Sequence, residues 1–162
     1  MLAGLAEWVA PGQSPDVIHF NCGLHDSRYF KIAGTYQQPL ANYTALLRGA
    51  VDWLKSNTDA QLVWATITPV ITDRLVAYWT ARAARGELKV EHFRYTDDIA
   101  SYNKAAREIM EAAGVAINDL HAIVQLASTE ELIADDGVHM TEKGTRLLAE
   151  AVADAIRGQL GS

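Results

Sequence analysis

Short apolar runs that favour β-strands alternate with longer amphipathic runs along most of this chain. The run D-V-I-H-F-N-C at 16–22 is followed by Gly23, and the run Q-L-V-W-A-T-I-T at 61–68 is followed by Pro69. A third, shorter run occupies 115–118. Strands that alternate with helices pair side by side in parallel, so the sequence predicts an α/β fold built on a parallel sheet.

Apolar residues at helical spacing fill the segments between and after these strands. We predict helices at 2–9, 40–56, about 74–84, 97–113, 119–127 and 141–157. The helix over 97–113 is predicted to be capped by Asp97 or Thr96 and ended by Gly114. We predict a polar loop at 24–39 and irregular structure over the rest of 70–96.

The composition suits one globular domain over residues 1–162, since 49% of the residues are hydrophobic and 21% are charged. A net charge of −6 without any Lys/Arg cluster argues against a nucleic-acid partner. One cysteine, Cys22, excludes an intrachain disulfide and a multi-cysteine zinc site. No apolar run is long enough to span a membrane. The N-terminal segment carries Glu7 and no basic leader, so we expect no export signal and a cytoplasmic protein.

An aspartate and a histidine, Asp136 and His139, stand three residues apart just before the helix predicted at 141–157. In such a turn the carboxylate can accept a hydrogen bond from one imidazole nitrogen, which leaves the other nitrogen free as a general base. The pattern is short, and taken alone it is more often a helix start with acidic residues near its positive end and a surface histidine.

Reactive groups of parallel sheets collect beyond the carboxyl ends of the strands. G-L-H-D-S at 23–27 follows the first predicted strand, Thr68 ends the second, and D-G-V-H at 136–139 lies in the last connection. We therefore expect these three segments to meet at one edge of the sheet. Ser14 precedes its strand and should lie at the opposite end, and His19 within the strand is interpreted as a core residue.

Two motifs together are similar to a known family: V-I-H-F-N-C-G-L-H-D at 17–26 and D-G-V-H at 136–139, before a C-terminal helix. In this order they resemble the SGNH hydrolases, also called GDSL esterases, over about residues 1–157. The resemblance implies a three-layer α/β/α flavodoxin-like fold and hydrolysis of small esters, often acetyl or short acyl groups, without metal or cofactor. It also implies that Asp136 and His139 belong to a Ser-His-Asp triad and that His25 stands in place of the family's oxyanion-hole asparagine. An imidazole N–H can fill that role.

The resemblance does not include the family's first two blocks, which hold the nucleophilic serine and an oxyanion glycine. It therefore implies a chain that lacks the first two strands of the fold. Ser27, directly after G-L-H-D, is the candidate nucleophile within the chain, and Thr68 is a weaker one. A serine from another chain and a water activated by His139 remain alternatives.

The other candidate site residues surround G-L-H-D. Gly23, Asn21 and Asp26 are expected near the oxyanion or the substrate. The loop residues Arg28, Tyr29 and Tyr36 are expected to shape the cleft. Trp79 is interpreted as a core residue that could also line a pocket, and His92 and His121 are interpreted as structural or exposed.

Without two neighbouring strands, the apolar strand at 16–22 becomes a free edge, and such edges pair with other chains. We therefore expect a homo-oligomer that binds a small ester and neither nucleic acid nor membrane. Two alternatives stay open: a non-catalytic remnant that serves as an oligomerising or binding module, and a fragment of a longer enzyme.

Overall fold

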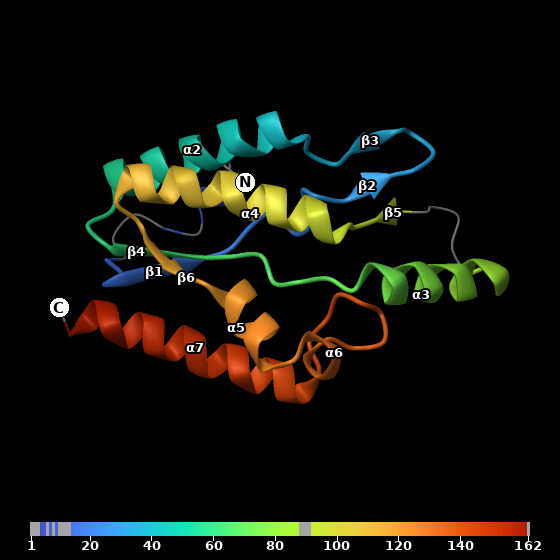
Figure 1. Cartoon of the computed structure of the whole chain (residues 1–162). Helices are drawn as coiled ribbons and strands as arrows, with labels where there is room; N and C mark the ends of the chain where they lie inside the picture. The colour runs from blue at the N-terminus through green and yellow to red at the C-terminus, as the bar shows by residue number, and fades with distance from the viewer. Residues whose placement is uncertain (1–3, 6, 8, 10–13, 88–91, 162) are drawn as a thin grey trace.

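A parallel sheet of three strands lies between two layers of helices (Figure 1). The computed structural model describes residues 4, 5, 7, 9, 14–87 and 92–161. The strands are β1 (Val17–Phe20), β4 (Gln61–Ala65) and β6 (Ala116–Asn118). They pair in parallel in the order β1-β4-β6, with four of the five β4 residues buried. The predicted parallel sheet is confirmed.

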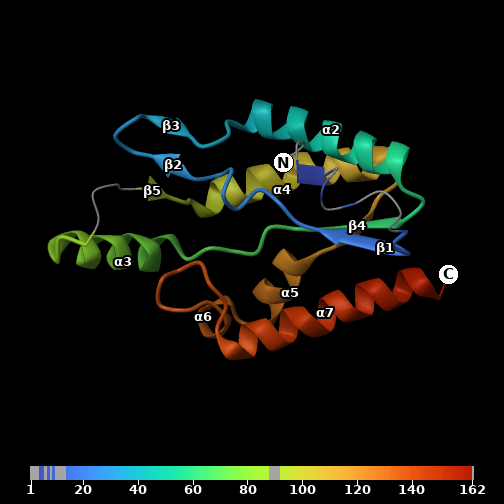
Figure 2. The same cartoon turned by 180° about the vertical axis from the view of Figure 1, so that it is seen from behind.

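Helices cover both faces of this sheet, as Figures 1 and 2 show from opposite sides. One layer holds α2 (Leu40–Asn57) and α4 (Thr96–Ala113), and the other holds α5 (Leu120–Ala127) and α7 (Glu142–Leu160). Fully buried side chains pack between the layers, among them Leu47, Trp64, Ile99 and Met110. The three-layer α/β/α arrangement is thus confirmed.

Two more helices lie beyond one end of the sheet, α3 (Thr72–Ala84) and the short α6 (Thr129–Leu132). Only α6 was not predicted, because one turn of helix leaves no periodic pattern. The helix predicted at 2–9 lies mostly outside the described residues. Gly114 ends α4 at φ 67°, as predicted, because glycine tolerates the left-handed conformation. The capping prediction is wrong: α4 begins at Thr96 itself, with no side-chain cap.

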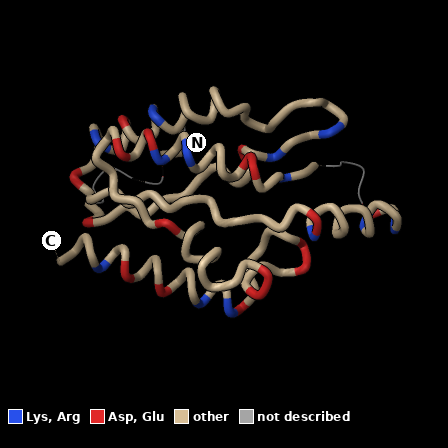
Figure 3. Tube along the Cα trace, viewed as in Figure 1, with Lys and Arg blue, Asp and Glu red and all other residues tan. Residues whose placement is uncertain are grey.

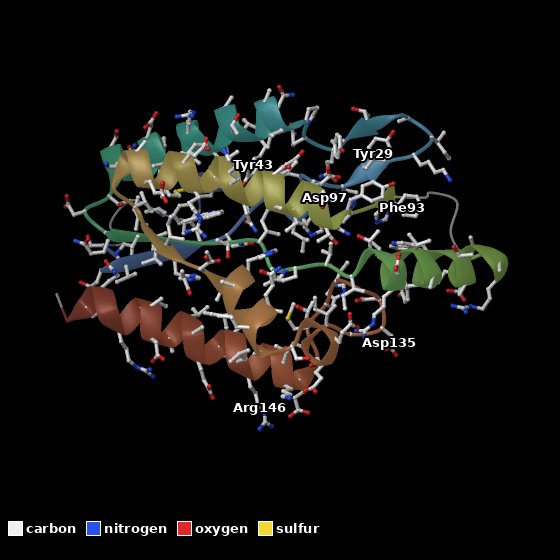
Figure 4. All side chains as sticks on the ribbon, in the orientation of Figure 1. Tyr29, Tyr43, Phe93, Asp97, Asp135 and Arg146 are labelled. Atoms are coloured by element: carbon white, nitrogen blue, oxygen red, sulfur yellow. The ribbon has the colours of Figure 1, made fainter. Side chains whose placement is uncertain are left out.

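A second, antiparallel sheet projects beside α3 in the order β3-β2-β5. Its strands are β2 (Tyr29–Phe30), β3 (Thr35–Tyr36) and β5 (His92–Phe93). Tyr29 pairs with Phe93, and both are labelled in Figure 4. The prediction of a plain loop over 24–39 and an irregular segment through His92 is therefore wrong. Two-residue strands are too short to show alternation, and their pairing joins segments far apart in the sequence.

The outer edge of β1 is open in the described part of the chain, where β1 pairs only with β4. It borders a largely apolar groove of about 620 Å³, lined by Leu5, Val9, Pro15, Val17, Ile18, His19, Phe20, Asn21, Cys22, Ala50 and Leu54. Acidic and basic residues are interspersed over the helices (Figure 3). Among the described helices, none is both long and apolar enough to cross a membrane. Pairing of two copies along β1 remains a prediction.

Candidate active site

A tight turn between α6 and α7 brings Asp136 and His139 together. The Asp136 Oδ2 atom accepts a hydrogen bond from the Nδ1–H of His139, and its Oδ1 atom accepts the backbone N–H groups of Val138 at 3.0 Å and His139 at 2.9 Å. Gly137 adopts φ 76° in this turn, and a Cβ there would lie 2.5 Å from the Ile71 carbonyl oxygen. Glycine is therefore required for both the turn and its packing against the start of α3.

The Asp136 carboxylate fixes the tautomer of His139. Partial burial by itself would raise the pKa of Asp136, but hydrogen bonds from the His139 ring and from the Val138 and His139 N–H groups hold it below its ordinary value. The ionised carboxylate keeps the proton of neutral His139 on Nδ1, so the Nε2 lone pair is free. The His139 side chain is 82% exposed, and that of Asp136 is 21% exposed. This geometry is that of a general base with its orienting partner.

His25 presents an N–H donor in the same region. Its Nδ1 atom lies 2.8 Å from Nη2 of Arg28. Because a guanidinium only donates, Nδ1 must accept, and the single proton of the neutral ring is then on Nε2. Partial burial, followed by the charges of Arg28 and Arg94, lowers the pKa of His25 and favours this neutral form.

A cavity of about 290 Å³ joins the dyad to the G-L-H-D loop. It is lined by Leu24, His25, Arg28, Leu75, Tyr78, Trp79, His92, Arg94, Asp136, Val138 and His139. These residues come from the loop after β1, from α3, from β5 and its end, and from the turn before α7. The expected meeting of the segment after the first strand with the segment at 136–139 is observed.

Four lining residues were not expected to belong to the site: Leu75, Tyr78, His92 and Arg94. Burial, followed by the charges of Arg28 and Arg94, lowers the pKa of His92 to about 4, and its ring lies 4.6 Å from that of Trp79. The one available sequence signal was an arginine inside the otherwise aromatic run H-F-R-Y at 92–95.

Ser27 does not line this cavity. The residue is 0% exposed, and its hydroxyl donates to the Leu24 carbonyl oxygen at 3.2 Å. In this position it behaves as a turn residue, and a substrate would reach it only after the loop rearranged. Thr68 does not line the cavity either, whereas Ser14 lies at the opposite, amino-terminal end of the strands, beside Gln61. The placement of Ser14 agrees with the prediction.

The other residues predicted around the oxyanion hold the backbone next to the cavity in place. Gly23 is buried at φ 122°, and a Cβ there would collide with Cδ1 of Ile67. The Asn21 amide donates to the Ala65 carbonyl oxygen at 2.7 Å, which ties the end of β1 to β4. The Asp26 carbonyl oxygen accepts the Gln38 N–H at 3.0 Å, which closes the base of the β2–β3 hairpin. None of the three lines the cavity.

A metal cluster is not present in the described part of the chain, where no three His, Cys, Asp or Glu side chains converge. His25, Asp136 and His139 line the cavity and Asp26 does not, but these residues do not form a metal-ligating group.

A parallel sheet between two layers of helices, with an Asp–His pair beyond its strand ends, is a three-layer α/β/α fold that carries an acid–base dyad. The chain belongs to the GDSL-like lipase/acylhydrolase family, whose sequence model matches residues 1–147. No curated protein matches the chain.

Solved structures share the fold. A lipase/acylhydrolase from Enterococcus faecalis has a TM-score of 0.73 at 20% identity, over 98% of this chain and 69% of that chain. An acetyl xylan esterase named AlAXEase has a TM-score of 0.66 at 17% identity, over 96% of this chain and 74% of that chain. An acetyl xylan esterase from Geobacillus stearothermophilus has a TM-score of 0.64 at 17% identity, over 93% of this chain and 65% of that chain. This chain therefore spans about two thirds to three quarters of the length of these relatives.

Proposed function

We propose that this chain hydrolyses carboxylic esters with a short acyl or acetyl group through the Asp136–His139 dyad. The observation that carries the proposal is the hydrogen bond that leaves Nε2 of His139 free in a cavity shared with the N–H donor of His25. Membership of an acylhydrolase family and the fold shared with two acetyl xylan esterases support the acyl-ester substrate.

The chemistry follows from the two imidazoles. Nε2 of His139 removes the proton of an attacking hydroxyl as its oxygen adds to the ester carbonyl carbon. The oxyanion accepts a hydrogen bond from Nε2–H of His25. When the tetrahedral intermediate collapses, the C–O bond to the alcohol breaks, and the alcohol takes the proton from the His139 imidazolium. If water attacked, the acyl group leaves as the acid; if a serine attacked, a water then hydrolyses the acyl-serine by the same steps. The Asp136 carboxylate stabilises that imidazolium.

The attacking hydroxyl has two candidate sources. No Ser, Thr or Cys side chain is among the described residues that line the cavity, so we propose that the hydroxyl is water or a serine supplied by another segment or chain. Ser27→Ala tests the remaining intrachain candidate. Because the Ser27 hydroxyl is buried and bonded to Leu24, we expect an unchanged rate. A loss of more than about 100-fold would make Ser27 the nucleophile.

Hydrolysis of p-nitrophenyl acetate by the wild type and His139→Ala tests the dyad. We expect the variant to lose about 10²- to 10⁴-fold in kcat/KM, the usual contribution of a general base. His19→Gln is the matched control, because it removes an imidazole that lies on β1 and contacts Asn118 rather than the cavity. Equal rates for the wild type and both variants would instead favour a non-catalytic binding module.

A further inference from the structure

Two guanidinium groups line the cavity beside His139. Arg28 comes from the loop after β1, and Arg94 directly follows β5. Arg94 is only 5% exposed, and its Nε donates to the Leu24 carbonyl oxygen at 2.7 Å. Arg28 donates through Nη2 to His25, and its Nε is buried without an acceptor. The two side chains thus offer more N–H donors than this part of the site has acceptors.

The positive charge of the pair is not balanced within the described residues, where neither Arg28 nor Arg94 forms an ion pair. The arginines that do pair with a carboxylate are Arg74, Arg82, Arg85, Arg107, Arg146 and Arg157. Arg94, by contrast, is the one buried charged residue in the described part of the chain. A buried cation without a partner is costly, so the site favours an anion.

Asp136 does not fill this role. It is the one carboxylate among the lining residues, and its oxygens already accept the His139 ring and two backbone N–H groups. Burial, followed by the charge of Arg28, lowers the pKa of Arg94 to about 10, although Asp136 opposes this shift. Arg94 therefore remains cationic at neutral pH, and the Arg28 guanidinium adds a second positive charge beside one engaged carboxylate.

We propose that Arg28 and Arg94 form a subsite for a carboxylate carried by the substrate, so that the preferred ester is anionic next to its scissile bond. The planar guanidinium matches a carboxylate through two parallel N–H···O bonds. Leu75, Trp79 and Val138 supply apolar walls for the carbon chain between the carboxylate and the ester. Hydrolysis of such an ester rests on the proposed function, but binding of the carboxylate does not.

Binding is tested by calorimetric titration of His139→Ala, which keeps the subsite and slows turnover. The two probes are monomethyl succinate and methyl levulinate, which differ only in a carboxylate against a methyl ketone. We expect the anion to bind about 10- to 100-fold more tightly, the range for charged hydrogen bonds. Equal binding of the two probes would overturn the proposal.

Arg28 is then replaced in the same background. Arg28→Gln should reduce the preference for the anion, because only Arg94 remains, and Arg28→Lys, which keeps the charge without the fork, should lose less of it. Arg48→Gln is the matched control, because Arg48 is exposed on α2 and lines a different surface pocket. An unchanged preference in Arg28→Gln would refute the subsite. Circular dichroism verifies that each variant is folded.

Turnover separates the two proposals. The wild type is assayed with p-nitrophenyl hemisuccinate and with p-nitrophenyl butyrate, its neutral counterpart of similar length. Tight binding of the anion without hydrolysis of either ester overturns the esterase and leaves the carboxylate subsite standing. Hydrolysis of both esters at equal kcat/KM overturns the subsite alone.

Discussion

The carboxylate of Asp136 is the group whose removal tests the proposed chemistry most selectively. Asp136→Asn keeps an Oδ1 atom that can still accept the Val138 and His139 N–H groups, so the turn should persist. The amide N–H₂ that replaces Oδ2 cannot accept from Nδ1–H of His139. The ring then loses the bond that fixes its tautomer, and the imidazolium formed during catalysis loses its counter-charge.

The magnitude follows from this one bond. A hydrogen bond to a charged group contributes about 1.5–3 kcal/mol, which corresponds to about 10- to 150-fold in rate. The His139 side chain is 82% exposed, and solvent screens charge interactions at such positions. We therefore expect the low end of this range, a fall of about 10-fold in kcat/KM.

The assay is hydrolysis of p-nitrophenyl acetate at pH 7.5. Asp135→Asn is the matched control, because Asp135 is the adjacent, exposed aspartate on the same loop (Figure 4) and should be neutral. Asp136→Ala also loses the two backbone bonds and should be less stable by about 1–2 kcal/mol in urea unfolding. Wild-type kcat/KM in Asp136→Asn would refute the role given to this carboxylate.

Three further predictions concern stability and assembly. Gly23→Ala should lower the free energy of unfolding in urea by about 2 kcal/mol, because φ is 122° and the new Cβ collides with Ile67; unchanged stability contradicts this. The pKa of His92 is about 4 in the folded state, below its ordinary value of 6.5, so its neutral form contributes stability above pH 6.5 that is lost as the pH falls toward 4. Between pH 7 and pH 5, the free energy of unfolding in urea should therefore fall by about 1 kcal/mol less in His92→Gln than in the wild type, after allowance for solvent screening. An equal fall in the two proteins would disprove this. Light scattering at micromolar concentration should show that the wild type is an oligomer and that Val17→Lys, on β1, dissociates it. Val76→Lys, at an exposed position on α3, is the control and should leave the oligomer intact. A monomeric wild type would exclude pairing along β1.

Local patterns were sufficient for much of the fold. Each strand of the parallel sheet is an apolar run bounded by turn residues, and the long helices carry their own periodicity. Gly114 marks the end of α4, because glycine adopts the left-handed conformation found there without strain. The Asp136–His139 hydrogen bond was also accessible to prediction, because both residues lie in one short turn whose geometry depends on nearby backbone.

The small sheet and the burial of Ser27 were not accessible in this way. Two-residue strands have no pattern of their own, and β2 pairs with β5, which is distant in the sequence, as well as with the neighbouring β3. Ser27 follows a promising motif, yet whether a turn hydroxyl faces solvent depends on which segments pack over it. Here the loop closes on itself through the Ser27–Leu24 hydrogen bond.

The sequence by itself determined the α/β class, the parallel sheet and the catalytic-type dyad, because these depend on periodicity and on contacts a few residues apart. Only the tertiary structure brought Arg28 and Arg94 to the same cavity as His139. The charge of that cavity is the sum of the charges of Arg28, Arg94 and Asp136, which come from three separate segments. No single stretch of the sequence contains that sum, so the preference for an anionic substrate could be inferred only after folding placed the segments together.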